Sequence, residues 1–315
     1  MPHRQTTLNI SLMTQTIEQL AQQLEQHPDY RVMRRLIPGR VFNTPAPGQS
    51  IAKGVVLDTE TTGLNIESDR VIELGMLTFE FDPVTGMLFR VTDVFDELED
   101  PGFEIPPESM AVHHITNEMV RGKRIDDARV TAALKDVQVV IAHNAAFDRP
   151  FVEARWPIFE RLNWGCSIKD IDWRKEGFGS AKLEYLVGLQ GYFYEAHRAE
   201  TDCWALLELL NMVLPQSQQT ALLTLLLSLN QPQQKIYALN SPFETKDKLK
   251  ARNYRWSAEL RCWSRVVSGE TEKQQELDWL KNHVYGQRSA RVEVETTGGT
   301  VRHSNRVGQK EMITI

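Results

Sequence analysis

Four carboxylates and one histidine, spread over three short segments, are the residue types that metal-dependent phosphodiester hydrolysis requires. Asp58 and Glu60 end one apolar run, Asp148 follows another, and His197 precedes Asp202 by five positions. Clustered carboxylates favour a hard divalent cation with oxygen ligands, such as Mg²⁺ or Mn²⁺. An imidazole titrates near neutral pH and therefore suits a general base. The sequence predicts a two-metal hydrolase if these segments converge.

The period of a strand places the first two carboxylates. Residues 54–57 (Gly-Val-Val-Leu) form a short apolar run and are predicted to be a buried strand. Positions two apart on a strand share a face, so Asp58 and Glu60 lie side by side. Two like charges this close cost free energy unless a cation bridges them, because one carboxylate otherwise tends to keep its proton. An acidic strand end without a metal is the alternative for this pair taken alone.

The remaining three residues follow two further elements. Residues 137–142 are predicted to be a second buried strand, and a helix that carries Asp148 begins shortly after them. Open α/β sheets gather ligand-binding groups at such strand ends. Asp202 starts an apolar helix, with His197 on the loop or first turn before it. Residues five apart on a helix point in different directions, so His197 can stand off the metals while Asp202 binds them.

Three strings in this sequence resemble the motifs of the DEDDh 3′–5′ exonucleases. They are residues 58–64 (Asp-Thr-Glu-Thr-Thr-Gly-Leu), residues 143–148 (His-Asn-Ala-Ala-Phe-Asp) and the spaced pair at 197 and 202. The resemblance covers about residues 51–215. It implies a ribonuclease H-like fold and an enzyme that hydrolyses phosphodiester bonds from 3′ ends. It further implies that nucleoside 5′-monophosphates are released one at a time with two divalent cations.

The resemblance also implies a role for each catalytic residue. Asp58 would bridge both ions, Glu60 and Asp202 would hold one of them, and Asp148 would support the other. His197 would accept the proton of the attacking water. The residues that match positions near the terminal nucleotide are Thr61, Thr62, Leu64, His113, Asn144 and Phe147.

Ordinary packing or turn formation is the alternative for most of these substrate-contacting residues. Leu64 matches a position that wedges against the terminal base, whereas Thr61 and Thr62 would approach the sugar through their backbone. His113 lies in residues 111–116, where His114 stands in place of the glycine usual in the family.

Composition fits an intracellular enzyme. With 315 residues and 41% hydrophobic content, the chain can bury a full core and is expected to hold more than one domain. The three cysteines, Cys166, Cys203 and Cys262, lack metal-ligand spacing and are too few for a disulfide framework, so we expect buried thiols. No apolar stretch of about 18 residues and no secretory pattern appear. The prediction is a soluble, cytoplasmic protein that does not enter a membrane.

Charge is divided unevenly along the chain. Residues 235–315 hold 15 Lys+Arg and 10 Asp+Glu, a balance of +5, whereas residues 1–234 hold 21 and 32, a balance of −11. Within residues 243–256, Tyr254 and Trp256 stand among lysines and arginines. Such a mixture could follow a phosphate backbone while stacking exposed bases. Alternatively, the aromatic residues form the core of a small domain, and both readings can hold together. Removing residues 235–315 is expected to weaken substrate binding and to leave the chemistry.

The pattern of apolar runs predicts three parts. They are an N-terminal helical extension (1–50), an exonuclease domain (51–230) and a small basic α+β domain (235–315). The central part is expected to be a mixed five-stranded α/β sheet with flanking helices. Its predicted strands are about 54–58, 70–81, 86–97, 137–142 and 163–168, the second and third forming a hairpin around residues 82–86.

The flanking parts have their own predicted elements. A helix over 16–26 is expected to pack with the first 50 residues on the core or on a partner. Residues 221–229 are expected to be a packed helix. The last part is expected to have strands at 235–239 and 261–267, a helix at 272–283 and a hairpin around 297–300.

Three functions fit these features. The favoured one is a 3′–5′ exonuclease acting on DNA, with single-stranded DNA as the main partner. An RNA-trimming enzyme of the same family is the second, because no residue settles how the pocket treats a 2′-hydroxyl. The third is a non-catalytic nucleic-acid-binding protein. A protein partner is conceivable but is not identified by any motif.

Overall fold

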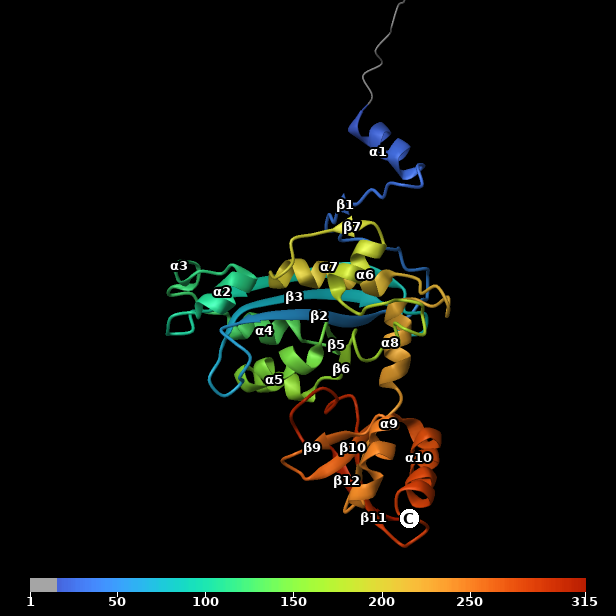
Figure 1. Ribbon diagram of the computed structural model, residues 1–315. Coiled ribbons are helices and arrows are strands. Elements are labelled where there is room, and N and C mark those ends of the chain that lie inside the picture. The colour runs from blue at the N-terminus through green and yellow to red at the C-terminus, as the bar shows by residue number, and fades with distance from the viewer. Residues whose placement is uncertain (1–15) are drawn as a thin grey trace, which may run out of the picture.

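A mixed five-stranded sheet lies at the centre of the computed structural model, which describes residues 16–315 (Figure 1). Its strand order is β4-β3-β2-β5-β6. Strand β2 pairs antiparallel with β3 and parallel with β5. The predicted mixed sheet of five strands is confirmed. The strands are β2 (Ala52–Thr61), β3 (Val71–Phe81), β4 (Leu88–Leu98), β5 (Val137–Ala142) and β6 (Trp164–Cys166).

Strands β3 and β4 form the predicted hairpin. The Gly86 N–H donates to the Asp82 carbonyl at 2.8 Å, and the Asp82 N–H donates to Met87 at 2.9 Å. Gly86 has a φ of +66°, a left-handed conformation that glycine adopts without steric cost. The turn chemistry read from residues 82–86 therefore fixes this connection.

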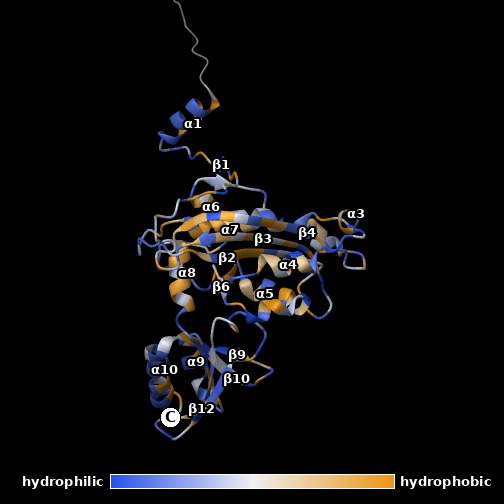
Figure 2. Cartoon of the chain, turned by 180° about the vertical axis from the view of Figure 1, so that it is seen from behind, coloured by the Kyte–Doolittle hydropathy of each residue, from blue (hydrophilic) through white to orange (hydrophobic). Residues whose placement is uncertain are grey.

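Helices cover both faces of the sheet, and alternation along β2 decides which side chains meet them. Val55 and Leu57 belong to one buried cluster and Val56 to the other. Figure 2 shows the apolar colouring concentrated where strands and helices meet. The helices that pack on the Val56 face are α6 (Leu183–Leu189), α7 (Ala199–Asn211) and α8 (Ala221–Leu229). Those on the Val55 face are α4 (Asp127–Ala133), α5 (Ala145–Arg155) and the 3₁₀ helix η1 (Pro157–Arg161).

Two short helices close one end of the sheet. They are α2 (Pro107–His113) and α3 (Asn117–Val120). Ile105, Ile115 and Val120 pack there against Ile72 of β3. This small cluster anchors the segment that contains His113.

The N-terminal part contacts the core from about residue 31 onward, where the Arg31 side chain donates to the Gly188 carbonyl of helix α6. Strand β1 (Arg34–Arg35) pairs in parallel with β7 (Tyr192–Phe193). Helix α1 (Ile17–Glu25) buries no residue, and Ile17 is 87% exposed. The helix therefore forms as predicted and stands clear of the sheet (Figure 1), so the core is not the surface that covers it, and packing on a partner stays a prediction. The first 15 residues of the predicted extension lie outside the described part.

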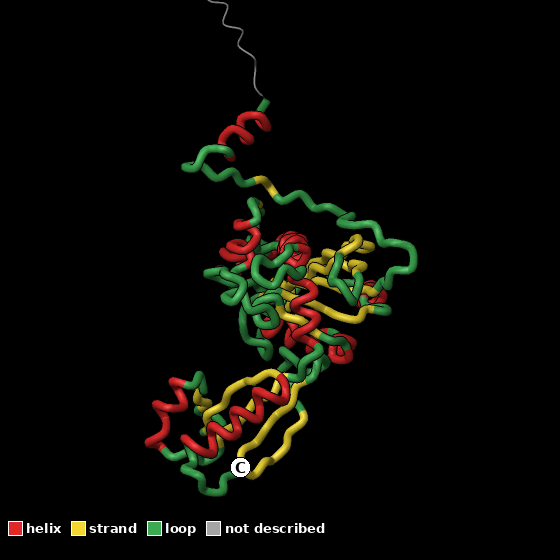
Figure 3. Tube along the Cα trace, turned by 90° about the vertical axis from the view of Figure 1, so that its right-hand side faces the viewer, coloured by secondary structure: helices red, strands yellow, loops and turns green. Residues whose placement is uncertain are grey.

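A second, antiparallel five-stranded sheet forms what we call the C-terminal module, residues 233–315. Its order is β12-β11-β8-β10-β9. Ile236, Leu249, Leu280 and Val292 are among its buried core residues. Its elements are β8 (Gln233–Ala238), η2 (Phe243–Thr245), α9 (Lys246–Ala251), β9 (Arg255–Ser257), β10 (Cys262–Ser268), α10 (Gly269–His283), β11 (Arg291–Thr297) and β12 (Gln309–Thr314). In Figure 3 this module lies beside the catalytic sheet as a separate body of strands and helices.

The predicted C-terminal hairpin forms, but its connection is long. Strands β11 and β12 pair antiparallel, and residues 298–308 join them. We call these residues the docking loop, because they reach the catalytic part of the chain. The Gly299 carbonyl accepts the Trp164 N–H of β6 at 3.0 Å. The hairpin predicted around 297–300 therefore forms, and its connection begins with a turn in which the Gly298 carbonyl accepts the Val301 N–H at 2.9 Å.

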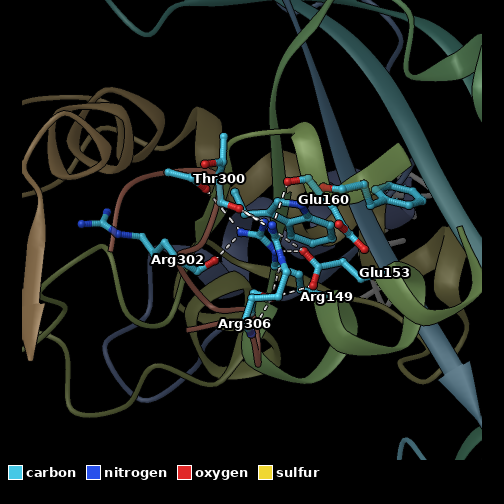
Figure 4. A network of polar contacts seen from close by, with 10 residues as sticks. Arg149, Glu153, Glu160, Thr300, Arg302 and Arg306 are labelled. Carbon is cyan, nitrogen blue, oxygen red and sulfur yellow. Dashed lines mark hydrogen bonds and ion pairs between the residues drawn. The ribbon is translucent and has the colours of Figure 1, made fainter. Parts of the chain in front are cut away.

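Arg149 of helix α5 is the centre of this junction (Figure 4). It is fully buried, and its Nε donates to Glu153 Oε1 at 2.7 Å. Its remaining nitrogens donate to the docking-loop carbonyls of Gly299, Thr300 and Arg302. Arg306 of the same loop donates to Glu153 Oε1 at 3.1 Å. The loop thus supplies carbonyl acceptors to Arg149 and a second cation to Glu153, so both members of this buried charge pair have further hydrogen-bond partners.

A second ion pair joins the loop to the segment after β6. Buried Arg302 donates to Asp170 Oδ1 at 3.2 Å and to the Ser228 carbonyl at 3.0 Å. His303 Nε2 lies 3.0 Å from Asp170 Oδ2, which also accepts the Cys166 N–H at 2.7 Å. The docking loop therefore fixes the C-terminal module on the catalytic sheet at two points.

Across residues 16–315, none of the helices combines the length and apolar character needed to cross a membrane. Cys166, Cys203 and Cys262 are free and buried, as predicted.

Candidate active site

The end of β2 directs its polar side chains to two different helices. Asp58 and Glu60 share the face of Val56, on which α7 packs. Thr59 lies on the opposite face, where α5 packs. Because neighbouring positions of a strand alternate, one short segment supplies groups to both helices. The predicted common face of Asp58 and Glu60 follows directly from this alternation.

A glycine lets helix α7 bring Asp202 to these two carboxylates. Gly75 of β3 is the cross-strand partner of Asp58. A Cβ atom at Gly75 would lie 2.5 Å from the carbonyl carbon of Ala199, the first residue of α7. Without that atom, the helix start lies directly on the strand. Carboxylate oxygens of Asp58, Glu60 and Asp202 consequently lie within 4.8 Å of one another.

A buried ion pair that sequence reasoning missed holds the same helix start in place. Glu73 of β3 is fully buried and is the cross-strand partner of Glu60. Arg198 donates to Glu73 Oε1 through Nε at 2.9 Å and Nη2 at 2.6 Å, and the Ala199 N–H donates to Oε2 at 3.0 Å. The sequence did contain a sign of this pair: Glu73 is a charged residue within the apolar run 71–81, and a buried charge needs a partner.

Asp148 reaches the cluster from the opposite helix. Its Oδ1 accepts the Thr59 N–H at 3.0 Å and the Thr59 hydroxyl at 2.9 Å. The side chain is 2% exposed. Asp148 is thus tied to the residue between Asp58 and Glu60, but it is not one of the three whose oxygens group within 4.8 Å. The structure brings all four predicted carboxylates to one strand end.

Burial and mutual repulsion raise the pKa values of these acids. Burial, followed by the charges of Asp148 and Asp202, raises the pKa of Asp58 well above its usual range. The pKa of Glu60 rises to about 8 and that of Asp148 to about 7, again mainly through burial. In the described part of the chain, none of the four forms an ion pair with Lys, Arg or His.

This donor set fits a hard divalent cation. Carboxylate oxygens are the ligands that Mg²⁺ and Mn²⁺ prefer, and a cation would remove the repulsion that otherwise keeps protons on the acids. The acidic cluster of Asp58, Glu60 and Asp202 could therefore hold metal ions, with Asp148 beside it.

His197 lies at the mouth of the hollow that contains the acids. Its backbone is left-handed, with a φ of 67°. The N–H groups of His197 and Arg198 donate to Asp202 Oδ2 at 2.8 and 3.2 Å. The His197 side chain is exposed and lines a hollow of about 780 Å³. The imidazole is therefore beside Asp202 and accessible to solvent.

Leu64 and Phe147 separate this hollow from a second one. Both side chains line the catalytic hollow and an adjoining hollow of about 610 Å³. Leu64 is 85% exposed, and Phe147 packs on Phe151 with ring centroids 5.2 Å apart. Asn144 lines the catalytic hollow with an exposed side chain. An exposed leucine beside a supported aromatic ring is suited to contact a flat base.

The predicted residues Thr61, Thr62 and His113 line the second hollow. The Thr61 hydroxyl donates to the Gly63 carbonyl at 2.6 Å, and the Thr62 hydroxyl accepts the Arg70 N–H at 3.0 Å. These hydroxyls shape the loop, and the Thr62 backbone is held as well, since its N–H donates to the Arg70 carbonyl at 2.9 Å and its carbonyl accepts the Ser109 hydroxyl at 2.8 Å. The backbone approach of a sugar at Thr61 and Thr62 stays a prediction.

His113 offers a hydrogen-bond donor to this hollow. Its Nδ1 accepts the Ile115 N–H at 3.0 Å, which places the proton of the neutral ring on Nε2. Burial lowers the pKa of His113, so the neutral form is favoured. Nε2 is buried and has no partner within residues 16–315. An unpaired buried N–H is costly unless a ligand accepts it.

Two further residues of the catalytic hollow were not predicted as site residues. His143 Nδ1 lies 2.7 Å from Ser167 Oγ, and burial lowers its pKa to about 4, so the ring stays neutral. Burial and the negative charge of Asp202 raise the pKa of Tyr194, which therefore stays protonated. His143 is the first residue of the second motif, so it could have been predicted as a site residue. No sequence pattern singles out Tyr194.

Comparisons with known proteins agree with this geometry. The family RNase_T, described as "Exonuclease", matches residues 55–210. DNA polymerase III subunit epsilon of Treponema pallidum is 32% identical over 165 residues, which cover 48% of this chain and 72% of that protein. A PolC-type DNA polymerase III of Lacticaseibacillus paracasei is 34% identical over 104 residues, which are 32% of this chain and only 7% of that protein.

The solved structures to which this chain is similar include two nucleases. "Exonuclease X in complex with 5′ overhanging duplex DNA" has 26% identity and a TM-score of 0.38, and the match covers 54% of this chain and 99% of the other. Exonuclease I of E. coli, in complex with a dA16 oligonucleotide, has 16% identity and a TM-score of 0.48 and covers 73% and 70% of the two chains.

Proposed function

Since this chain belongs to the DEDD family of exonucleases and is a 3′–5′ exonuclease, we propose that it degrades single-stranded DNA with two divalent cations, Mg²⁺ or Mn²⁺. The products would be nucleoside 5′-monophosphates. The observation that carries this proposal is the grouping of Asp58, Glu60 and Asp202 oxygens within 4.8 Å without a basic partner in the described residues. DNA is favoured because the relative from Treponema pallidum is named as a DNA polymerase subunit.

Each acid has a distinct proposed role. Asp58, between the two helices, would contact both cations, and Glu60 and Asp202 would hold one of them. Asp148, fixed by the two Thr59 donors, would support the other. When bound, the cations would supply positive charge that stabilises the entering and departing oxygens of the scissile phosphate. The cluster itself keeps these ligands aligned before substrate arrives.

Proton transfer is assigned to His197. Its exposed imidazole at the mouth of the hollow can accept a proton from the attacking water and pass it to solvent. His143 is a poor alternative base, because burial lowers its pKa to about 4 and Ser167 occupies Nδ1.

The terminal nucleotide is assigned to the space around Leu64 and Phe147. Leu64 would press on the terminal base, with Asn144 beside it. The His113 Nε2–H and backbone groups near Thr61 and Thr62 would bond to the terminal sugar. The three free, buried cysteines fit a protein that folds in a reducing compartment, so we propose a cytoplasmic location.

A length ladder tests this function. We expect 5′-labelled single-stranded DNA to shorten from its 3′ end in Mg²⁺ or Mn²⁺ and to remain intact in EDTA. Matched DNA and RNA 20-mers, with and without a complementary strand, identify the preferred substrate. Asp58→Asn is the matched inactive control. Intact oligonucleotides in either metal would contradict the proposed activity, and faster shortening of RNA than DNA would contradict the proposed substrate.

A further inference from the structure

A groove on the C-terminal module lies next to the catalytic hollow. It has a volume of about 740 Å³ and is formed by strands β8, β9 and β10 together with Lys169 and His303. Lys169 belongs to the catalytic domain, whereas His303 belongs to the docking loop. The docking loop thus places one residue of the catalytic domain in the lining of a groove that the module otherwise forms.

Four consecutive residues connect the groove to the catalytic hollow. Ser167 bonds to His143, and Ile168 lines the catalytic hollow. Lys169 lines the groove, and Asp170 binds Arg302 and His303 of the docking loop. Because adjacent residues face the two spaces, a ligand that passes over residues 168–169 enters both.

The groove carries three cations that have no acidic partner within residues 16–315, besides Arg265, whose guanidinium pairs with Glu272 and Glu276. Its lining includes Lys169, Lys235 and Arg255 and contains no Asp or Glu. None of these three cations forms an ion pair within residues 16–315. Lys169 and Arg255 are exposed. Free cations on a chain of net charge −6 mark the groove as a place for an anionic ligand.

An exposed aromatic ring adds a stacking surface. Trp256 is 51% exposed and rests on Trp263, with ring centroids 5.5 Å apart. Arg255 and Trp256 both line the groove, so its occupant has access to a charge for phosphate and to a ring for a base. This combination of basic groove and supported aromatic ring is how proteins hold single-stranded nucleic acid without reading its sequence.

We propose that this groove binds the upstream nucleotides of a single-stranded nucleic acid whose 3′ end lies in the catalytic hollow. This inference rests on the proposed function, because it assigns a binding site to the upstream part of the same substrate. Phosphates would contact Lys169, Lys235 and Arg255, and a base would stack on Trp256. The groove would thereby make activity depend on strand length.

Two measurements distinguish the role of the groove from that of the catalytic site: binding of a long strand and hydrolysis of a small ester. Anisotropy of fluorescein-labelled dT20 with the full-length protein in EDTA measures binding without cleavage. Trp256→Ala is expected to weaken binding roughly 10-fold, and Trp256→Tyr is expected to restore it, since stacking supplies the contact. Replacing Lys169, Lys235 and Arg255 together by Gln should reduce the slope of log K against log salt by about 2.

Matched controls lie in the same module but outside the groove. Phe243 is 74% exposed, and Lys281 is exposed on α10. Phe243→Ala and Lys281→Gln should bind dT20 like the unmodified protein. Hydrolysis of thymidine 5′-(4-nitrophenyl phosphate) with Mn²⁺, a substrate too short for the groove, should be unchanged in all the groove variants.

Two results would overturn the groove assignment. One is unchanged dT20 affinity and salt slope in the groove variants, and the other is an equal loss of small-ester hydrolysis, which would place the effect at the catalytic site or in the fold. Absence of hydrolysis by the unmodified protein would instead reject the proposed function, while dT20 binding would still report on the groove. Equal losses with rU20 and dT20 support recognition of bases and phosphates irrespective of the sugar.

Discussion

Two buried charge clusters meet at consecutive residues of helix α5. Asp148 lies beside the acidic cluster of Asp58, Glu60 and Asp202; burial and mutual repulsion raise the pKa values of these four carboxylates, and none has a basic partner within residues 16–315. Arg149 belongs to the junction with the docking loop, where the charges of Glu153, Asp170 and Arg302 are paired and buried. Buried charges thus lack partners of opposite sign in the first cluster and have them within the chain in the second.

This difference in charge pairing indicates the role of each cluster. Burying like charges without partners opposes folding, so the acidic cluster is expected to become favourable only with a bound cation. The Arg149 junction requires no ligand, because its donors meet carboxylates and carbonyls of the chain itself. Perturbing the first should change activity more than stability, and perturbing the second should do the reverse.

The largest effect is expected from removing one charge of the acidic cluster. Asp58→Asn should lower the single-turnover rate on single-stranded DNA by about 10³-fold or more, since about 4 kcal/mol of charge stabilisation is lost. In EDTA, however, its melting temperature should equal or exceed that of the unmodified protein, because repulsion is relieved. A loss of unfolding free energy as large as the loss of transition-state stabilisation would contradict this expectation.

The second effect is expected at the junction. Arg149→Met should lower the free energy of unfolding by about 3–5 kcal/mol, because Glu153 and three carbonyls lose a buried partner. Urea unfolding in EDTA measures this loss. Arg90→Met removes an exposed pair with Glu80 and is the matched control, expected to cost below about 1 kcal/mol. Equal effects of the two changes would mean that the junction is not a special source of stability.

The third effect concerns pH. An unfolded Glu loses its proton near pH 4.5, whereas folded Glu60 keeps it to about pH 8 and Asp148 keeps its own to about pH 7. The folded state therefore binds more protons between these values, and the stability of metal-free protein should fall as pH rises from 6.5 to 8. We expect a loss of about 1–3 kcal/mol, measured by urea unfolding in EDTA. An undiminished fall in Glu60→Gln would show that other groups cause it.

The smallest effect is stabilisation by a cation. Mn²⁺ at about 100 times its dissociation constant should raise the free energy of unfolding by about 2.7 kcal/mol. The rise should be largest near pH 8, where the acids are ionised, and should vanish in Asp58→Asn. An equal rise in that variant would place the bound ion elsewhere.

Local sequence patterns were sufficient to predict where the catalytic acids lie at the strand ends. Alternation in residues 54–60 and apolar spacing in 203–210 predicted where Asp58, Glu60 and Asp202 would lie, because strand and helix periods determine which side chains share a face. The motif strings supplied Asp148 and His197 and the family. The Glu73–Arg198 pair was missed, since a residue 125 positions away supplies the partner.

The C-terminal part shows where such reasoning stops. The basic and aromatic residues of 243–256 were visible, but the role of the docking loop was not. Removing residues 235–315 would leave Arg149, Glu153 and Asp170 without the loop, so we now expect truncation to destabilise the catalytic domain as well as weaken binding.

The amino-acid sequence by itself determined the family, the strands and the set of acids, because these depend on residue type and short-range period. Only the tertiary structure decided that Gly75 admits helix α7, that Arg149 donates to carbonyls of a loop about 150 residues away, and that Lys169 and Trp256 line one groove. Such pairings leave no periodic trace along the chain, since they depend on how two sheets pack together.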